Sequence, residues 1–242
     1  MIGTEQAKKN KCDGDLHVIG IECEKSRGLP YFSAKIRRMK KLAAESIGTA
    51  MIMLVMLLSP AQWTPFATGA MWMALTYTGM GISGAHYNPA TSLALMIQGK
   101  ITRDEFPAYF VAQLAGAGFA ALIAGFLISC TDHPTVLLHT NQMFCAIMAE
   151  FLGAFLLIYM YQHATQTTST ISQPFYGMII GFAFMALHIS LSSISGGYFN
   201  PALAFGAAIM GNIAWSDIWL YLVGGLLGAA AANTTFTLLH NE

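Results

Sequence analysis

Two copies of one motif hold the residues best suited to bind a small polar molecule. The copies are Ser83-Gly84-Ala85-His86-Tyr87-Asn88-Pro89-Ala90 and Ser195-Gly196-Gly197-Tyr198-Phe199-Asn200-Pro201-Ala202. Each asparagine amide offers two N–H donors and one oxygen acceptor, which suits reversible hydrogen bonding to a polar molecule. No nucleophile–base pair, metal-ligand spacing or phosphate-binding loop accompanies them, so the pattern does not indicate an enzyme or a cofactor.

The asparagine–proline pairs predict where two short helices begin. Proline suits the first position of a helix, and the residue before it is displaced from helical geometry, which favours Asn88 and Asn200 as N-caps. We therefore expect helices over residues 89–98 and 201–211. Each has roughly two to three turns, about half of what crosses a bilayer.

The chain is built from two related halves. Asn88 and Asn200 are 112 positions apart (200 − 88 = 112), and Gly116 and Gly228 keep the same spacing. Half-helices at matched positions of a repeat predict discontinuous helices that meet at the membrane midplane with their positive ends inward. The predicted halves are residues 42–130 and 143–239.

Composition indicates a membrane protein. Hydrophobic residues make up 55% of the chain and charged residues 10%, too apolar for a soluble domain of this length. The predicted spans are 42–60, 65–82, 104–129, 143–162, 175–191 and 216–238. The predicted fold class is an all-α membrane protein with six transmembrane helices plus two half-helices in an inverted repeat.

The basic residues predict the topology. All 12 lysines and arginines lie at or before Arg103. The cluster over residues 35–41 abuts the first span and should stay in the cytoplasm, and Lys100 returns to the same face two crossings later. We therefore expect both termini in the cytoplasm, with residues 1–41 a disordered tail. The plasma membrane and an intracellular membrane both remain open.

The paired motifs resemble those of the aquaporin (major intrinsic protein) family, over about residues 42 to 239. The resemblance implies a narrow pore, a homotetramer in the lipid bilayer, no cofactor or metal, and no nucleic-acid partner. It also implies a passive channel for water or small neutral solutes.

The resemblance implies an outer constriction as well, formed by Thr68, His188, Gly197 and Leu203. His188 matches the water-selective members of the family. At position 203 most of the family has arginine, and at position 68 an aromatic residue is usual. This chain has smaller or uncharged residues at both, so we expect a relaxed filter. His86 is expected at the cytoplasmic mouth.

Two acidic residues lie deep in predicted spans, where a carboxylate is costly and is a functional candidate by default. A proton relay is one interpretation of Glu45 and Glu150. Because the two occupy corresponding positions of the repeat, we favour the role that the resemblance implies, hydrogen-bond anchors for the asparagine loops.

The predicted function is a channel that conducts water and small uncharged solutes, such as glycerol, urea, ammonia or hydrogen peroxide, and excludes ions. Asparagine N–H groups and two helix N-termini facing the pore would oppose protons and other cations. One alternative is a poorly conducting structural or junctional membrane protein with the same fold. A secondary transporter also has broken helices in an inverted repeat, but the two intramembrane glutamates here have no basic partner or substrate counter-charge.

Overall fold

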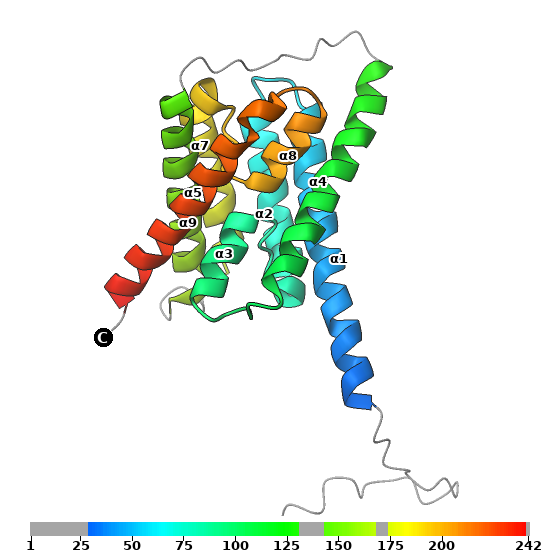
Figure 1. Ribbon diagram of the computed structural model, residues 1–242, viewed down its shortest axis with the longest axis vertical. Helices are drawn as coiled ribbons and strands as arrows, with labels where there is room; N and C mark the ends of the chain where they lie inside the picture. Colours follow the sequence, from blue (N-terminus) through cyan, green and yellow to red (C-terminus); the bar gives the residue numbers. More distant parts are fainter. Residues whose placement is uncertain (1–28, 131–142, 168–173, 241–242) are drawn as a thin grey trace, which may run out of the picture. The chain divides into compact units, whose positions relative to one another are not determined.

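The structure is a computed structural model, and it describes residues 29–130, 143–167 and 174–240 (Figure 1). Helices form the regular structure of these segments. The long helices are α1 (Leu29–Leu58), α2 (Thr64–Ser83), α4 (Phe106–Ser129), α5 (Met143–Gln166), α7 (Tyr176–Ser195) and α9 (Ile218–His240). The short elements are α3 (Pro89–Ile97), α8 (Pro201–Ile209) and the 3₁₀ turn η2 (Trp215–Asp217).

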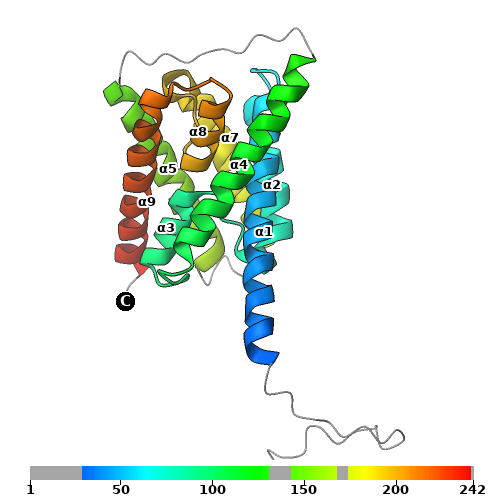
Figure 2. The ribbon, with the colours of Figure 1, turned by 45° about the vertical axis from the view of Figure 1, so that its right-hand side comes forward.

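The helices form two sets with the same order of long and short elements. The first set is α1, α2, α3 and α4, and the second is α5, α7, α8 and α9, with the short helix third in each. Figures 1 and 2 show α3 in the lower part of the helical region and α8 in the upper part. The predicted fold class, long spanning helices plus two half-helices in an inverted repeat, is confirmed.

Five of the described helices, α1, α4, α5, α7 and α9, have both the length and the hydropathy of membrane spans. The remaining predicted span, residues 65–82, corresponds to α2, which is 20 residues long, as α7 is. At 1.5 Å per residue this length covers about 30 Å, the thickness of a bilayer's hydrocarbon core. The sequence of α2 includes four threonines, which lower its mean hydropathy.

The N-terminal boundary differs from the prediction. Helix α1 begins at Leu29, whereas the first span was expected at 42 and a disordered tail over residues 1–41. Between Pro30 and the span, the segment contains neither proline nor glycine and several lysines and arginines, which are good helix formers, so the helix extends beyond its apolar part. The prediction for residues 1–28 lies outside the described residues.

A capping box precedes α4, as the Thr102-Arg103-Asp104-Glu105 sequence predicts. The Thr102 backbone N–H donates to Glu105 Oε2 at 3.1 Å, and the Glu105 N–H donates to Thr102 Oγ1 at 3.2 Å. These reciprocal bonds satisfy two donors at the turn from which α4 starts.

Each half-helix packs against a long helix of the other set. Helix α3 packs against α9 of the other set, and α8 packs against α4 in the same way. The helices α2 and α7 also pack on each other across the repeat. Alanine and other buried apolar side chains fill the space between them. The halves therefore share one core, and neither half encloses its own motif.

Glycines bring α2 and α7 into direct backbone contact. A Cβ atom on Gly69 would lie 2.7 Å from the Gly181 carbonyl oxygen, and a Cβ on Gly181 would lie 2.6 Å from the Gly69 carbonyl oxygen. In a membrane, burial of apolar side chains between helices gives no advantage over lipid, so this close packing holds the pair together.

The contact predicts opposite outcomes for two glycines of α2. Gly69→Ala should destabilise the protein by about 1–3 kcal/mol, because the methyl group meets the backbone of α7. Gly81→Ala is the matched control: a Cβ there meets no atom within 4 Å. It should be neutral or stabilising by up to about 1 kcal/mol, because alanine favours helix. Thermal melting of the purified variants measures both, and equal melting temperatures would contradict the packing argument.

Candidate functional site

The loops that lead into α3 and α8 have the same unusual backbone. Positive φ recurs at matched positions, at Gly84 (94°), Ala85 (52°) and Tyr87 (49°), and at Gly196 (92°), Gly197 (69°) and Phe199 (51°). Left-handed geometry is unfavourable for a bulky side chain and costs of the order of 1–3 kcal/mol. Tyr87 and Phe199 can adopt it only because surrounding contacts hold the loops in place.

In the first loop, the fully buried carboxylate of Glu45 supplies those contacts. Its Oε1 accepts hydrogen bonds from the Ser83 hydroxyl at 2.6 Å and the His86 backbone N–H at 3.0 Å. Its Oε2 accepts from the Tyr87 N–H at 2.7 Å and from the Gln113 amide nitrogen at 2.8 Å. One side chain thus fixes two consecutive peptides of the loop.

Glu150 repeats this arrangement in the second loop, and it is also fully buried. Its Oε1 accepts from the Ser195 hydroxyl at 2.7 Å and the Tyr198 N–H at 3.1 Å. Its Oε2 accepts from the Phe199 N–H at 2.6 Å. Both glutamates therefore have the contacts that loop anchors require.

Two tyrosines add a second support that sequence reasoning missed. The Tyr109 hydroxyl donates to the Ser83 carbonyl oxygen at 3.0 Å, and the Tyr221 hydroxyl donates to the Ser195 carbonyl oxygen at 2.7 Å. Each tyrosine thus forms a hydrogen bond with the last residue of the helix that precedes an asparagine loop, α2 or α7. Their spacing is also 112 residues (221 − 109 = 112), so the repeat contained a signal that could have identified them.

The two asparagines meet through reciprocal hydrogen bonds. Asn88 Nδ2 donates to the Phe199 carbonyl oxygen at 3.0 Å, and Asn200 Nδ2 donates to the Tyr87 carbonyl oxygen at 2.9 Å. Each asparagine thus binds the peptide that precedes the other asparagine. Both side chains are fully buried.

Each asparagine also caps its own half-helix, as the sequence predicts. Asn88 Oδ1 accepts from the Ala90 N–H at 2.8 Å, and Asn200 Oδ1 accepts from the Ala202 N–H at 2.9 Å. In both helices a proline, Pro89 or Pro201, follows the cap. The positive ends of two helix dipoles therefore meet at the asparagine pair.

Two of the four predicted constriction residues are in contact. His188 Nδ1 lies 3.0 Å from the Gly197 carbonyl oxygen, which can only accept, so Nδ1 carries the proton. Thr68 and Leu203 are fully buried. The Thr68 hydroxyl has no hydrogen-bond partner in the described part of the chain, so the structure does not connect it to His188 or Gly197.

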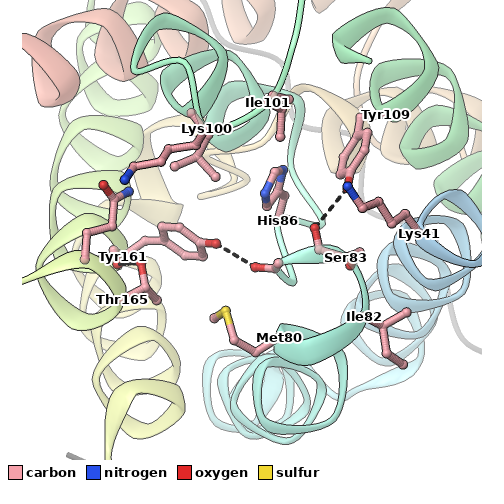
Figure 3. A pocket seen from close by; sticks show the side chains of 13 residues that line it. Lys41, Met80, Ile82, Ser83, His86, Lys100, Ile101, Tyr109, Tyr161 and Thr165 are labelled. Atoms are coloured by element: carbon pink, nitrogen blue, oxygen red, sulfur yellow. Dashed lines mark hydrogen bonds between the residues drawn. The ribbon is translucent and has the colours of Figure 1, made fainter. Parts of the chain in front are cut away.

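A cavity of about 430 Å³ lies next to the last turn of α2 and the start of the first loop (Figure 3). Side chains from α1, α2, α3, α4 and α5 and from the segment after α3 line it. We call it the basic mouth, and its lining residues are Lys41, Met80, Ile82, Ser83, Gly84, His86, Leu95, Lys100, Ile101, Tyr109, Tyr161, Thr165 and Gln166. His86, which was predicted to line a mouth of the pore, is among them.

A hydrogen-bonded chain connects His86 to the first anchor. His86 Nδ1 lies 3.0 Å from the Ser92 hydroxyl, and the Gln113 amide nitrogen donates to that hydroxyl at 3.0 Å and to Glu45. Sequence reasoning missed Ser92 and Gln113, which have no polar counterparts at the positions 112 residues later. Among the described residues, no group of three His, Cys, Asp or Glu side chains could hold a metal ion.

Comparisons with known proteins agree on one family. A family model described as "Major intrinsic protein" matches residues 32–236. Aquaporin PIP2-5 of Oryza sativa subsp. japonica is 34% identical over 178 residues, which cover 69% of this chain and 63% of that protein. Probable aquaporin PIP2-4 of Arabidopsis thaliana is 33% identical over 178 residues, covering 69% of this chain and 61% of that protein. The chain thus spans less than two thirds of the length of these relatives.

Among solved structures, the X-ray structure of the aquaglyceroporin from Plasmodium falciparum has a similar fold. Its TM-score is 0.68, and the match covers 83% of this chain and 95% of that chain. The sequence identity is 17%, so this likeness concerns the fold.

The anchor geometry predicts a stability difference between buried and exposed glutamates. Glu45→Gln and Glu150→Gln should each destabilise the protein by about 2–4 kcal/mol, because the new NH₂ group faces donors instead of accepting from them. Glu105→Gln is the control. Glu105 pairs with Lys41 at 3.3 Å near the surface, and loss of such a pair costs less than about 1 kcal/mol. Chemical or thermal unfolding in detergent measures the three variants, and a Glu45→Gln protein as stable as Glu105→Gln would exclude the anchor role.

Proposed function

Because this chain belongs to the major intrinsic protein family, we propose that it is a passive transmembrane channel that conducts water and small uncharged solutes and excludes ions. Family membership and the apolar helices make it an integral membrane protein, and the family supports a channel rather than an enzyme. The observation that carries the proposal is the reciprocal pair of bonds by which Asn88 and Asn200 join the two half-helices.

The bonding of the asparagines supports both conduction and ion exclusion. In each amide the oxygen is occupied by the helix cap, and one N–H is used across the repeat. The second N–H of each amide can be donated to a passing molecule. A water that accepts from both asparagines cannot donate backward along the file, so proton hopping is interrupted there. The two positive helix ends oppose cations at the same point.

The outer constriction supports a relaxed selectivity. We propose that Thr68, His188, Gly197 and Leu203 form it. Leu203 supplies an apolar wall, whereas an arginine would narrow the pore and donate hydrogen bonds. The unpartnered Thr68 hydroxyl and the second nitrogen of His188 are its polar groups. This combination suits small neutral solutes as well as water, among them glycerol, urea, ammonia and hydrogen peroxide.

The surroundings of the channel are part of the proposal. The likeness to aquaporins supports a homotetramer, in which each subunit has its own pore. The basic residues near the start of α1 and after α3 support a topology with both termini in the cytoplasm. The channel would lie in the plasma membrane or an intracellular membrane.

Osmotic swelling of proteoliposomes tests the function. Vesicles with the purified protein should shrink faster than empty vesicles in a sucrose gradient, because water has a pore. In glycerol and urea gradients they should then swell again as the solute enters. Water permeability equal to that of empty vesicles would overturn the channel and favour a poorly conducting structural protein with this fold.

The constriction predicts the effect of restoring a positive side chain. Leu203→Arg should reduce glycerol and urea permeability severalfold while water flow stays measurable, because the guanidinium narrows the opening and holds water by hydrogen bonds. Stopped-flow light scattering measures all three permeabilities in the same vesicles.

Leu203→Met is the control, because it conserves volume and apolar character. Leu203 is fully buried and an unpaired charge there is costly, so assembly of the arginine variant is checked by size-exclusion chromatography. Identical solute profiles for well-folded wild type and Leu203→Arg would place Leu203 outside the constriction.

A further inference from the structure

The charges that line the basic mouth are not all neutralised. The Lys41 ammonium lies 3.3 Å from Glu105 Oε1. The hydrogen bond from the Thr102 backbone N–H, together with the Lys41 ammonium, lowers the pKa of Glu105, so this carboxylate is ionised and balances Lys41 at neutral pH. Lys100 has no side-chain hydrogen bond or ion pair in the described part of the chain, and it is exposed.

Lys100 lies beside the first motif. In Figure 3, Lys100 and Lys41 lie on opposite sides of His86, which belongs to the first loop and lines the cavity. The other titratable groups that line the cavity are His86 and the hydroxyls of Tyr109 and Tyr161. The two hydroxyls donate to the backbone carbonyl oxygens of Ser83 and Gly84, respectively. Among the described residues no carboxylate lines the cavity, so the Lys100 ammonium makes this part of its lining positively charged.

The rest of the proposed path carries no permanent positive charge. No lysine or arginine follows Arg103 in the sequence, so the second half can supply none. The proposed constriction consists of a threonine, a histidine, a glycine and a leucine. Any fixed positive side chain that acts on a molecule in the pore must therefore come from the end at which Lys100 lies.

We propose that Lys100 is a specificity-determining residue of this channel, whose ammonium repels cations in the basic mouth before they reach the asparagine pair. The inference rests on the proposed channel function. It assigns part of the cation barrier to a residue outside both motifs and the constriction.

The position of Lys100 makes this effect physically reasonable. A cleft with charges of one sign and low-dielectric walls concentrates the field on any ion inside it. The repulsion acts over the Debye length, which is about 30 Å at 0.01 M salt and about 3 Å at 1 M. The barrier should therefore be strong at low salt and weak at high salt, which a purely structural role of Lys100 would not produce.

The test compares Lys100→Gln, Lys100→Arg and the control Arg103→Gln in proteoliposomes at 0.01 M salt. Arg103 is exposed and does not line the cavity. A voltage-sensitive dye reports potassium leak, a pH dye reports proton leak, and light scattering reports water flow. We expect Lys100→Gln to raise the ratio of potassium leak to water permeability at least threefold, and Lys100→Arg to match wild type. Arg103→Gln should raise the ratio less than Lys100→Gln does, because Arg103 acts from outside the cavity.

The dependence of the leak on ionic strength distinguishes electrostatic repulsion by Lys100 from a structural role of this residue. At 1 M salt, the wild-type ratio should rise toward that of Lys100→Gln. Equal ratios for wild type and Lys100→Gln at 0.01 M salt, or a raised ratio in Lys100→Arg, would overturn the role of Lys100 and leave the channel intact. Absence of water flow in wild type would instead overturn the proposed function, and the inference with it.

Discussion

The structure depends on one constraint, which is that the chain leaves helical geometry at two points inside a membrane. Lipid cannot form hydrogen bonds with the exposed peptide groups there, and each unsatisfied group costs several kcal/mol. The protein meets this need with two buried carboxylates, because a carboxylate accepts several hydrogen bonds and donates none. Glu45 and Glu150 each hold two consecutive backbone N–H groups and a serine hydroxyl. The left-handed backbone, the half-helices and the asparagine pair all depend on these bonds.

The two halves anchor their loops in the same way, but the residues around the two anchors differ. In the first half, Gln113 and Ser92 extend the polar network from Glu45 to His86 and the basic mouth. The corresponding residues of the second half are Gly225 (225 − 113 = 112) and Ala204 (204 − 92 = 112), which have no polar side chains. One end of the proposed path is thus polar and charged, and the proposed constriction contains no lysine, arginine or carboxylate. Two loops with the same backbone conformation thus have different side chains around them.

Local sequence patterns predicted the features that depend on neighbouring residues. The asparagine–proline pairs predicted both N-caps and half-helices, and Thr102 and Glu105 predicted the capping box, because these bonds join residues a few positions apart. The spacing of the repeat predicted that the asparagines belong to one site. The hydropathy of a span did not locate the start of α1, because a helix can continue past the apolar segment into basic residues.

The features that were missed depend on contacts distant in sequence. The bond between Gln113 and Glu45 spans 68 residues, and nothing in the neighbourhood of either residue indicates it. Positive φ at Tyr87 and Phe199 contradicts local preference and follows only from the anchors. The cavity around Lys100 takes its lining from five helices, so its charge balance could be described only once they were packed.

The reciprocal bonds between the motifs have a consequence for biosynthesis. The bond from Asn88 reaches the carbonyl of a residue 111 positions later in the chain. When the ribosome has completed α3, neither α8 nor α9, against which α3 packs, has yet been made. The first half must therefore remain in the bilayer, with α3 lacking its contacts with α8 and α9, until those two helices have been translated. Formation of the bonds between the two asparagine loops is therefore a late folding event. Polypeptides truncated before Asn200 lack the second asparagine, which completes these bonds.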